Sequence, residues 1–228
     1  MSDDLERVHR YDRWFESTWG QFAFEVEWKQ VRSALGAVEG VHVLDVGCGT
    51  GRVAKLLEEV GAVVVGLDRD SAMLEFARPR VHGELVLGDA HRLPFADGCF
   101  DAAIAVTVCE FTADPALVIA EMARVVRRGG RVVVGSLNPR SLWGLDHRRR
   151  LREEPWASAR FLSRRDLRRI GSSWGTATVR SSLYSSPALA SHRWMAKLAE
   201  QMGKVSPGLG AFQTLRIVTK LSSTSPDQ

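Results

Sequence analysis

The stretch that decides the fold is Val43-Leu44-Asp45-Val46-Gly47-Cys48-Gly49-Thr50-Gly51. It predicts an apolar strand that runs into three alternating glycines, followed by a helix over residues 51–60. Glycine lets the backbone turn sharply and approach a ligand closely, because no Cβ stands in the way. The helix start adds N–H groups and a positive dipole end, which favour an anionic group. The stretch therefore predicts a nucleotide-type site, with Asp45 placed to bind a ligand's ammonium group.

The glycine spacing separates two classes of nucleotide-binding protein. Dinucleotide enzymes usually show G-x-G-x-x-G, whereas here Gly51 comes one residue early and Arg52 stands where the third glycine would be. This spacing disfavours a nicotinamide-dependent oxidoreductase. A plain strand-to-helix turn is the structural alternative, but D-x-G-x-G-x-G after an apolar strand favours a ligand site.

Apolar strands alternate with amphipathic helices along most of the chain. This pattern predicts an α/β, Rossmann-like doubly wound sheet, parallel in the main and covered by helices on both faces. Gly129 and Gly130 are expected to end the helix that precedes the fifth strand. Strands are expected at 41–46, 62–67, 84–87, 100–106, 131–137, 174–183 and 211–221, and helices at 51–60, 71–77, 115–126, 163–170 and 187–202.

Residues 1–38 form a helical N-terminal segment that Gly20 is expected to divide into two helices. Tyr11, Trp14, Phe15 and Trp19 make it strongly aromatic. Two interpretations stay open: a packing helix, or a lid over a pocket.

Composition excludes several classes of protein. The 228 residues carry a net charge of +4, which does not by itself indicate nucleic acid. The three cysteines, Cys48, Cys99 and Cys109, form no C-x-x-C pair, so neither a disulfide scaffold nor a cysteine metal site is expected, and no metal is predicted. No apolar run approaches the roughly 20 residues of a membrane span, and the N-terminus is acidic, so we expect a cytoplasmic protein without membrane insertion.

Acidic residues stand at the ends of the second and third strands. Asp68 follows the glycines by about 20 residues and is placed to accept both hydroxyls of a ribose, although a helix cap is the alternative. Asp89, within Gly88-Asp89-Ala90, could accept the amino group of an adenine. Met73 could pack on the ring face, or it could be ordinary core.

These motifs occur in one order along the chain and together resemble a known family. They are the 45–51 stretch, the Asp68 strand end, Gly88-Asp89-Ala90 with Leu93-Pro94-Phe95, Phe100-Asp101, and Arg127-Arg128-Gly129-Gly130-Arg131. The chain resembles the class I S-adenosylmethionine-dependent methyltransferases, in the branch similar to the ubiquinone/menaquinone-biosynthesis (type 11) enzymes. The resemblance is good over residues 40–137 and looser over 160–221; Arg128 departs from the usual proline.

The resemblance implies S-adenosylmethionine as cofactor, S-adenosylhomocysteine as product, and a seven-stranded sheet whose last strand is antiparallel. Beside what the resemblance implies, we expect a lid at 1–38, a methyltransferase domain at 39–221 with insertions at about 138–160 and 185–208, and a tail at 222–228. For the cofactor the resemblance implies backbone contacts from Gly47, Cys48 and Gly49, ribose binding by Asp68 with Arg69 beside the adenine, adenine recognition by Gly88, Asp89 and Ala90, and Val106 and Thr107 facing the sulfonium.

The acceptor is less clearly marked in the sequence. Methyl transfer mainly needs alignment of nucleophile, methyl and sulfur, so no catalytic residue is compulsory and none is assigned. Substrate-pocket candidates, each with a structural alternative, are Tyr11, Trp14, Phe15, Glu110, Arg140, Trp143 and His147. The aromatic residues, with Trp156, indicate a partly apolar pocket.

Charge and missing motifs narrow the class of acceptor. Between Arg140 and Arg169, ten arginines stand against four acidic residues, which indicates an anionic acceptor or simply a solvated surface. No Asn/Asp-Pro-Pro-aromatic motif follows the fourth strand, which argues against methylation of nucleic-acid bases. We therefore expect a small-molecule acceptor, anionic or lipophilic, and a monomer or homodimer. A regulatory protein that keeps the fold without turnover stays open.

Overall fold

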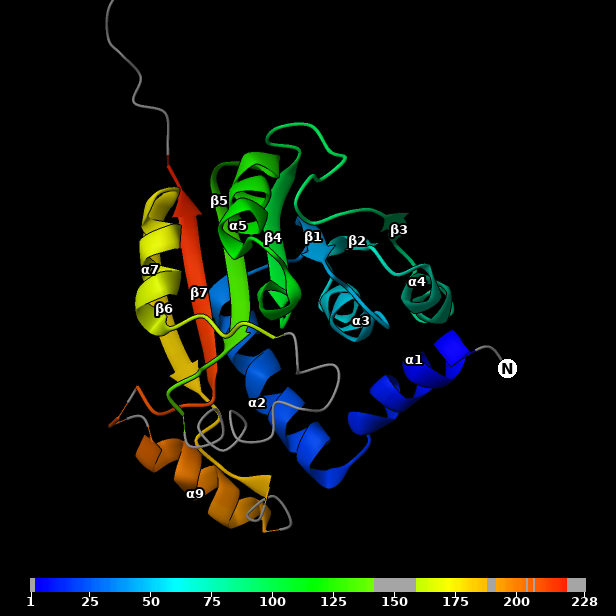
Figure 1. Ribbon diagram of the computed structural model, residues 1–228. Helices are drawn as coiled ribbons and strands as arrows, with labels where there is room; N and C mark the ends of the chain where they lie inside the picture. The colour runs from blue at the N-terminus through cyan, green and yellow to red at the C-terminus, as the bar shows by residue number, and fades with distance from the viewer. Residues whose placement is uncertain (1–2, 142–158, 188–191, 204, 207, 221–228) are drawn as a thin grey trace, which may run out of the picture.

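One sheet runs through the molecule, and a computed structural model describes it over residues 3–141, 159–187, 192–203, 205–206 and 208–220 (Figure 1). Within these residues seven strands are ordered β3-β2-β1-β4-β5-β7-β6. Strands β1 to β5 pair in parallel, and β7 is antiparallel to both of its neighbours. The predicted fold is confirmed. The strands are β1 His42–Val46, β2 Val63–Asp68, β3 Glu84–Leu87, β4 Phe100–Val106, β5 Val126–Leu137, β6 Gly175–Ser182 and β7 Phe212–Thr219.

Helices cover both faces of the sheet. Helices α2 and α3 contribute to one buried apolar cluster, and α5 and α7 to the other. Consecutive strand residues point to opposite faces: Val133 joins the first cluster and Val134 the second, and both are fully buried. The helices are α1 Asp3–Trp14, α2 Thr18–Leu35, α3 Arg52–Glu59, α4 Ser71–Ala77, α5 Pro115–Val125, α7 Arg164–Ser172 and α9 Arg193–Gly203, with a short 3₁₀ turn, η1, at Cys109–Phe111.

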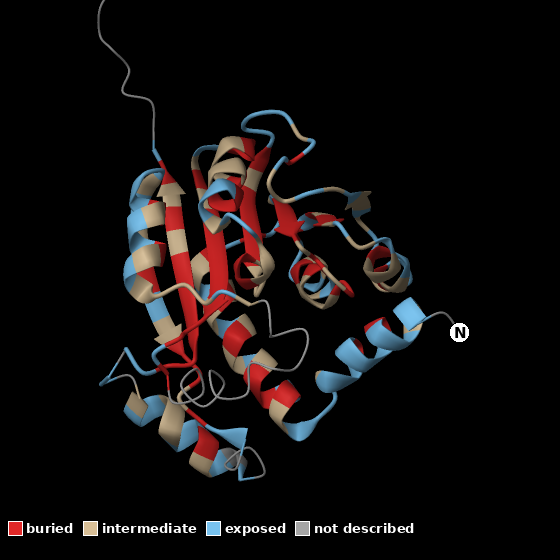
Figure 2. Ribbon diagram, in the orientation of Figure 1, coloured by how far each residue is buried: buried red, intermediate tan, exposed pale blue. Residues whose placement is uncertain are grey.

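Burial explains why the strands were readable from sequence. The central strands are buried on both sides, so they appear as continuous apolar runs (Figure 2). Helix α7 also begins as predicted, because Ser163 and Asp166 form a capping box. By contrast, α1 is mostly exposed, with only Val8 and Asp12 buried.

The break between the first two helices does not lie at Gly20. Helix α1 ends at Trp14, and Gly20 lies inside α2, so the predicted break was wrong by a few residues. Ser17 is the reason: it is the N-cap of α2, and its side chain accepts a hydrogen bond from the Gly20 N–H at 3.0 Å. Gly20 fits there because a Cβ would lie 2.0 Å from the Trp14 carbonyl oxygen.

The fifth strand begins earlier than predicted. Strand β5 starts at Val126, and Gly129 and Gly130 lie inside it instead of ending helix α5. Val126 pairs with Phe100, after which the register shifts, and Gly129 takes up the irregularity with φ of 74°. A Cβ at Gly130 would lie 2.6 Å from the Asp101 carbonyl oxygen. The glycines therefore serve strand pairing, which no local pattern shows.

The remaining boundaries agree within a few residues, except that α9 begins at Arg193 instead of 187. Of the predicted loop at 138–159, most lies outside the described residues. The carboxyl ends of the parallel strands meet at one edge of the sheet, where α1 and the start of α2 also lie (Figure 1). No helix in the described ranges is long and apolar enough to span a bilayer.

Candidate functional site

The glycine loop is hydrogen-bonded to the neighbouring strand, β2. Gly47, Gly49 and Gly51 all have positive φ, between 52° and 76°. The N–H groups of Gly47 and Cys48 both donate to the Leu67 carbonyl of β2, at 2.6 and 3.0 Å. A Cβ at Gly47 would lie 2.5 Å from Val108 Cγ2, so the loop also fits closely against the segment after β4. The glycines are therefore required by conformation and by space.

Asp68 joins this loop to the turn after β2. One carboxylate oxygen accepts a hydrogen bond from the Gly49 N–H at 2.8 Å, and the other accepts from the Asp70 N–H at 2.9 Å. Its side chain is half-buried at the end of β2. The structure thus brings the two strongest sequence signals, the glycines and Asp68, into direct contact.

A second acid, Asp45, lies beneath the loop. Asp45 is 2% exposed, and its Oδ2 has no hydrogen-bond partner in the described part of the chain. Burial, reinforced by the nearby charge of Asp68, raises the pKa of Asp45 to about 8. An unpartnered buried carboxylate oxygen is costly, and a ligand N–H donor would satisfy it.

The residues predicted to recognise adenine lie at the end of β3 and the start of α4. Asp89 is exposed, and it accepts hydrogen bonds from the backbone N–H of His91 at 2.9 Å and from its Nδ1 at 2.7 Å, which lowers the Asp89 pKa. Met73 is half-buried in the first turn of α4, and Arg69 is exposed. Ala90 packs against the apolar core. Sequence reasoning missed His91, although the Asp-x-His spacing was its signal.

The end of β4 carries local strain. Thr107 has φ of 52°, which is unusual for a β-branched residue, and its hydroxyl donates to the Val106 carbonyl at 2.8 Å. Val106 is half-buried against the core. Strained residues of this kind cluster at functional sites.

Helix α1 is fixed to the site by a buried ion cluster that sequence reasoning missed. Asp12 accepts hydrogen bonds from Thr50 Oγ1 at 2.7 Å, from Arg52 at 2.8 Å and from Arg80 at 3.0 Å. Burial opposes ionisation of Asp12, but the hydrogen bonds from Arg80 and Arg52 hold its pKa well below the usual range. Arg7 pairs with Asp70 at 2.7 Å.

The aromatic candidates of the N-terminal segment have different surroundings. Tyr11 lies against the loop, since a Cβ at Gly49 would be 3.9 Å from Tyr11 Cε1. Phe15 makes edge contacts with Tyr11, Trp14 and Phe24 at ring distances of 5.0–5.4 Å, and Arg52 lies over its ring. Trp14 is 44% exposed. The structure therefore brings Tyr11 to the loop, although Tyr11 is 41% exposed and so nearly as accessible as Trp14.

Two buried glutamates lie close to the same edge of the sheet. Glu110 is fully buried; its Oε1 accepts from the Leu137 N–H at 2.6 Å, while Oε2 has no partner among the residues described. Burial raises the pKa of Glu110 to about 7. Glu27 on α2 is 8% exposed, and burial followed by the charge of Glu110 raises its pKa to about 8. Sequence reasoning missed Glu27, whose signal was an acid among the apolar positions of a helix.

The other acceptor candidates are not gathered there. The side chain of Arg140 is exposed, while Trp143 and His147 lie outside the described residues. In the ranges that the structure describes, no group of His, Cys, Asp and Glu could hold a metal.

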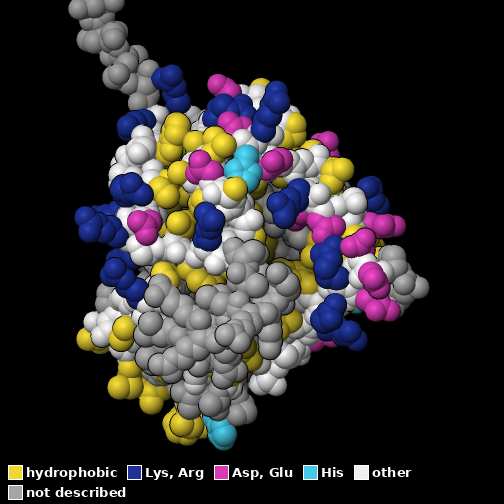
Figure 3. Space-filling view, in the orientation of Figure 1, with side chains coloured by type: hydrophobic (Ala, Val, Ile, Leu, Met, Phe, Trp, Pro, Cys, Tyr) yellow, Lys and Arg dark blue, Asp and Glu magenta, His cyan; other side chains and the backbone are white. Residues whose placement is uncertain are grey.

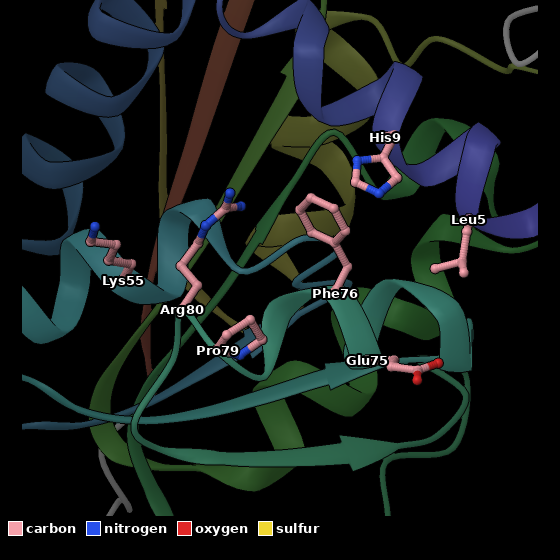
Figure 4. Close-up of a pocket in the computed structure, with 7 residues that line it drawn as sticks. All are labelled: Leu5, His9, Lys55, Glu75, Phe76, Pro79 and Arg80. Carbon is pink, nitrogen blue, oxygen red and sulfur yellow. The ribbon is translucent and has the colours of Figure 1, made fainter. Parts of the chain in front are cut away.

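A pocket of about 540 Å³ lies between α1, α3 and α4 (Figure 4). His9 points from α1 toward Phe76, with ring centres 5.0 Å apart. None of the residues lining this pocket is a predicted site residue; they are Leu5, His9, Lys55, Glu75, Phe76, Pro79 and Arg80.

Comparisons with known proteins agree with this geometry. Residues 44–134 match the model of the methyltransferase domain family. A demethylmenaquinone methyltransferase of Thermotoga maritima is 39% identical over 122 residues, which cover 52% of this chain and 53% of that protein. The chain spans about half the length of such curated relatives.

Solved structures extend the similarity to nearly the whole chain. A methyltransferase of Thermotoga maritima that depends on S-adenosylmethionine superposes with a TM-score of 0.76 at 27% identity, covering 95% of this chain and 97% of that one. Geranyl diphosphate C-methyltransferase of Streptomyces coelicolor, solved with S-adenosylhomocysteine, shares the fold at 18% identity, with a TM-score of 0.61 over 85% of this chain and 78% of that one. The chain therefore matches the methyltransferase domain family over residues 44–134 and is similar, over nearly its whole length, to a methyltransferase that depends on S-adenosylmethionine.

Proposed function

We propose that the protein transfers the methyl group of S-adenosylmethionine to a small-molecule acceptor. The observation that carries the proposal is the Asp68–Gly49 hydrogen bond, which fixes the glycine loop beside an acid at the end of β2. The loop fits the methionyl end, because its glycine backbone carries no side chain that would block a ligand and because Asp45 offers a buried, unpartnered oxygen beside it.

Different residues bind different parts of the cofactor. In the proposal, the backbone of Gly47, Cys48 and Gly49 holds the methionyl carboxylate, and Asp45 accepts from its ammonium group. Asp68 holds the ribose. A ribose hydroxyl would replace one of the two backbone N–H groups that now donate to the Asp68 carboxylate. The adenine lies among Arg69, Met73, Gly88, Asp89 and Ala90, and the sulfonium lies beside Val106 and Thr107.

The bound cofactor supplies an electrophilic methyl group, so the protein mainly has to align the reactants and exclude water. Helix α1 helps to exclude water from the site, because the Asp12 cluster holds this helix against Thr50 and Arg52 at the glycine loop. Tyr11 lies on the loop from the same helix. The lid interpretation of the N-terminal segment is therefore part of the proposal.

The acceptor is proposed to have a lipophilic body. The aromatic cluster of Tyr11, Phe15 and Phe24 offers apolar surface beside the loop, and relatives are named as demethylmenaquinone methyltransferases. The arginines of α7 offer weaker support for an anionic acceptor. Arg165, Arg168 and Arg169 are exposed, and basic side chains spread over this side of the surface (Figure 3). They behave as a solvated face, and nucleic acid is not proposed as a partner.

Calorimetric titration with S-adenosylhomocysteine tests the proposal, with NADH as the control ligand. We expect micromolar affinity for S-adenosylhomocysteine, about −8 kcal/mol, and no binding of NADH. Incubation with labelled cofactor and a panel of reduced quinones and phenols then tests transfer. Binding of NADH alone would contradict the proposal, and cofactor binding without any product would favour a regulatory protein of the same fold.

A further inference from the structure

Two buried acids, Glu27 and Glu110, have no basic partner among the described residues, and they bear on the class of acceptor. We propose that Glu27 and Glu110 bind the methyl acceptor together, and that its nucleophilic group carries an N–H or O–H hydrogen. This inference rests on the proposed function and specifies the acceptor of the same site.

Glu110 is held rigidly next to the loop. It follows Val108 by two residues, and Val108 is the side chain that a Cβ at Gly47 would strike. The Glu110 backbone carbonyl accepts from the Arg160 N–H at 2.7 Å, and its Oε1 accepts from Leu137. Oε2 has no partner within hydrogen-bond geometry in the described ranges, although the buried Ser136 hydroxyl interacts with this carboxyl, so Oε2 is the oxygen available to a ligand.

Glu27 approaches from the other side. It lies on α2, one turn before the buried Val31, and this helix packs on β5 and β7. Three residues further along α2, Gln30 donates to Thr214 Oγ1 at 3.1 Å, and Thr214 pairs with Gly135, two residues before Leu137. Three residues before Glu27, the ring of Phe24 packs edge-on against Phe15, which packs against Tyr11 beside the glycine loop. Glu27 therefore lies on the turn of α2 between the end of β5 that binds Glu110 and the aromatic residues beside the loop.

No lysine, arginine or histidine pairs with either glutamate among the residues that the structure describes. The titratable groups whose charges interact with them are each other, the Tyr11 phenol from α1 and the neighbouring Cys109 thiol. A buried carboxylate without a partner is destabilising, and such groups are typical of binding and catalytic sites. A donor group of the acceptor would supply the missing hydrogen bonds.

Methyl transfer to an N–H or O–H nucleophile can be written with every bond and proton accounted for. The lone pair on nitrogen or oxygen forms the bond to the methyl carbon, while the carbon–sulfur bond breaks and its electron pair stays on sulfur. The hydrogen of the nucleophile leaves as a proton, which one glutamate accepts and later passes to water. Whenever either glutamate is ionised, a carboxylate or phosphate in the same place would meet like charge, so the pair disfavours anionic nucleophiles.

Three probes with one ring and different head groups test this inference: phenol, benzylamine and benzoate. Each is titrated calorimetrically into protein saturated with S-adenosylhomocysteine. We expect phenol or benzylamine to bind at least tenfold more tightly than benzoate, and the two probes distinguish an O–H from an N–H acceptor. In the Glu27→Gln and Glu110→Gln variants we expect this preference to fall at least tenfold, with S-adenosylhomocysteine affinity within twofold of wild type.

Glu25→Gln is the matched control, since Glu25 is an exposed acid on the same helix. Its probe preference should equal that of wild type. Probe affinity should also vary between pH 6 and 9 in wild type and less in Glu27→Gln, a response that a purely structural role would not give. Equal or tighter binding of benzoate, failure of phenol and benzylamine to bind, or an unchanged preference in both variants would overturn the inference. Failure of S-adenosylhomocysteine to bind wild type would instead overturn the proposed function.

Discussion

The Asp12 carboxylate of α1 accepts two hydrogen bonds from the guanidinium of Arg52, the first residue of α3, both at 2.8 Å. Arg80 and the Thr50 hydroxyl bind the same carboxylate. Because Thr50 adjoins the glycine loop, one acid connects the N-terminal helix, the loop and the helix that follows it. The position of α1 over the site therefore depends on Asp12.

Replacing Asp12 by Asn should loosen this helix. Arg52 and Arg80 would face each other without a countercharge, and we expect the free energy of unfolding to fall by about 1–3 kcal/mol. We also expect a severalfold weaker affinity for S-adenosylhomocysteine. Urea denaturation and calorimetry measure the two effects. Asp4→Asn, at the exposed start of the same helix, should change neither; a stable, tight-binding Asp12→Asn protein would show that α1 does not depend on the cluster.

Acid should abolish the difference between wild type and Asp12→Asn. The folded-state pKa of Asp12 lies well below the ordinary value of 3.8, so its ionised form stabilises the protein above that value. This stabilisation is lost as the pH falls through the folded-state pKa. The two unfolding free energies should therefore converge below about pH 4. If the unfolding free energies of the two proteins instead kept a constant difference across that pH range, the charge of Asp12 would not contribute to the stability of the fold.

Gly47 and Gly40 form a matched pair for the loop. Both have φ of 68°, but a Cβ at Gly47 would lie 2.5 Å from Val108, whereas none of the neighbours of Gly40 lies within 4 Å. Gly40→Ala should cost only the strain of positive φ, about 1 kcal/mol, and leave cofactor affinity unchanged. Gly47→Ala should cost about 2–4 kcal/mol and weaken cofactor binding. Equal effects of the two changes on cofactor binding would show that the close approach to Val108 is unimportant.

Asp68→Ala should weaken binding of S-adenosylhomocysteine at least tenfold, about 1.4 kcal/mol, because the ribose loses its acceptor and Gly49 loses its partner. The exposed Asp97, which pairs with Arg124 on the surface, provides the control substitution to Ala. Calorimetry decides the matter: unchanged affinity in Asp68→Ala would exclude the ribose assignment.

Local patterns were enough to predict the sheet, the glycine loop and Asp68. The strands are apolar because they are buried on both faces, and the loop needs glycines because its backbone has positive φ; each cause lies within a few residues of its effect. The start of β5 was different, since Val126 becomes a strand residue by pairing with Phe100, far along the chain. Asp12 was likewise invisible, because Arg52 and Arg80 lie 40 and 68 residues away.

Stability at alkaline pH tests Glu27 independently of any ligand. Burial raises the pKa of Glu27 from 4.5 to about 8, so the folded protein keeps a proton that the unfolded chain releases. The stability that this proton gives is complete below about pH 4.5 and is lost as the pH rises toward 8. Glu27→Gln cannot ionise, so its unfolding free energy should gain about 1–3 kcal/mol relative to wild type between pH 5.5 and 8.5. Urea denaturation at both pH values measures this gain, and Glu25→Gln should show none. A constant difference between Glu27→Gln and wild type would mean that Glu27 titrates normally and is not held in an apolar site.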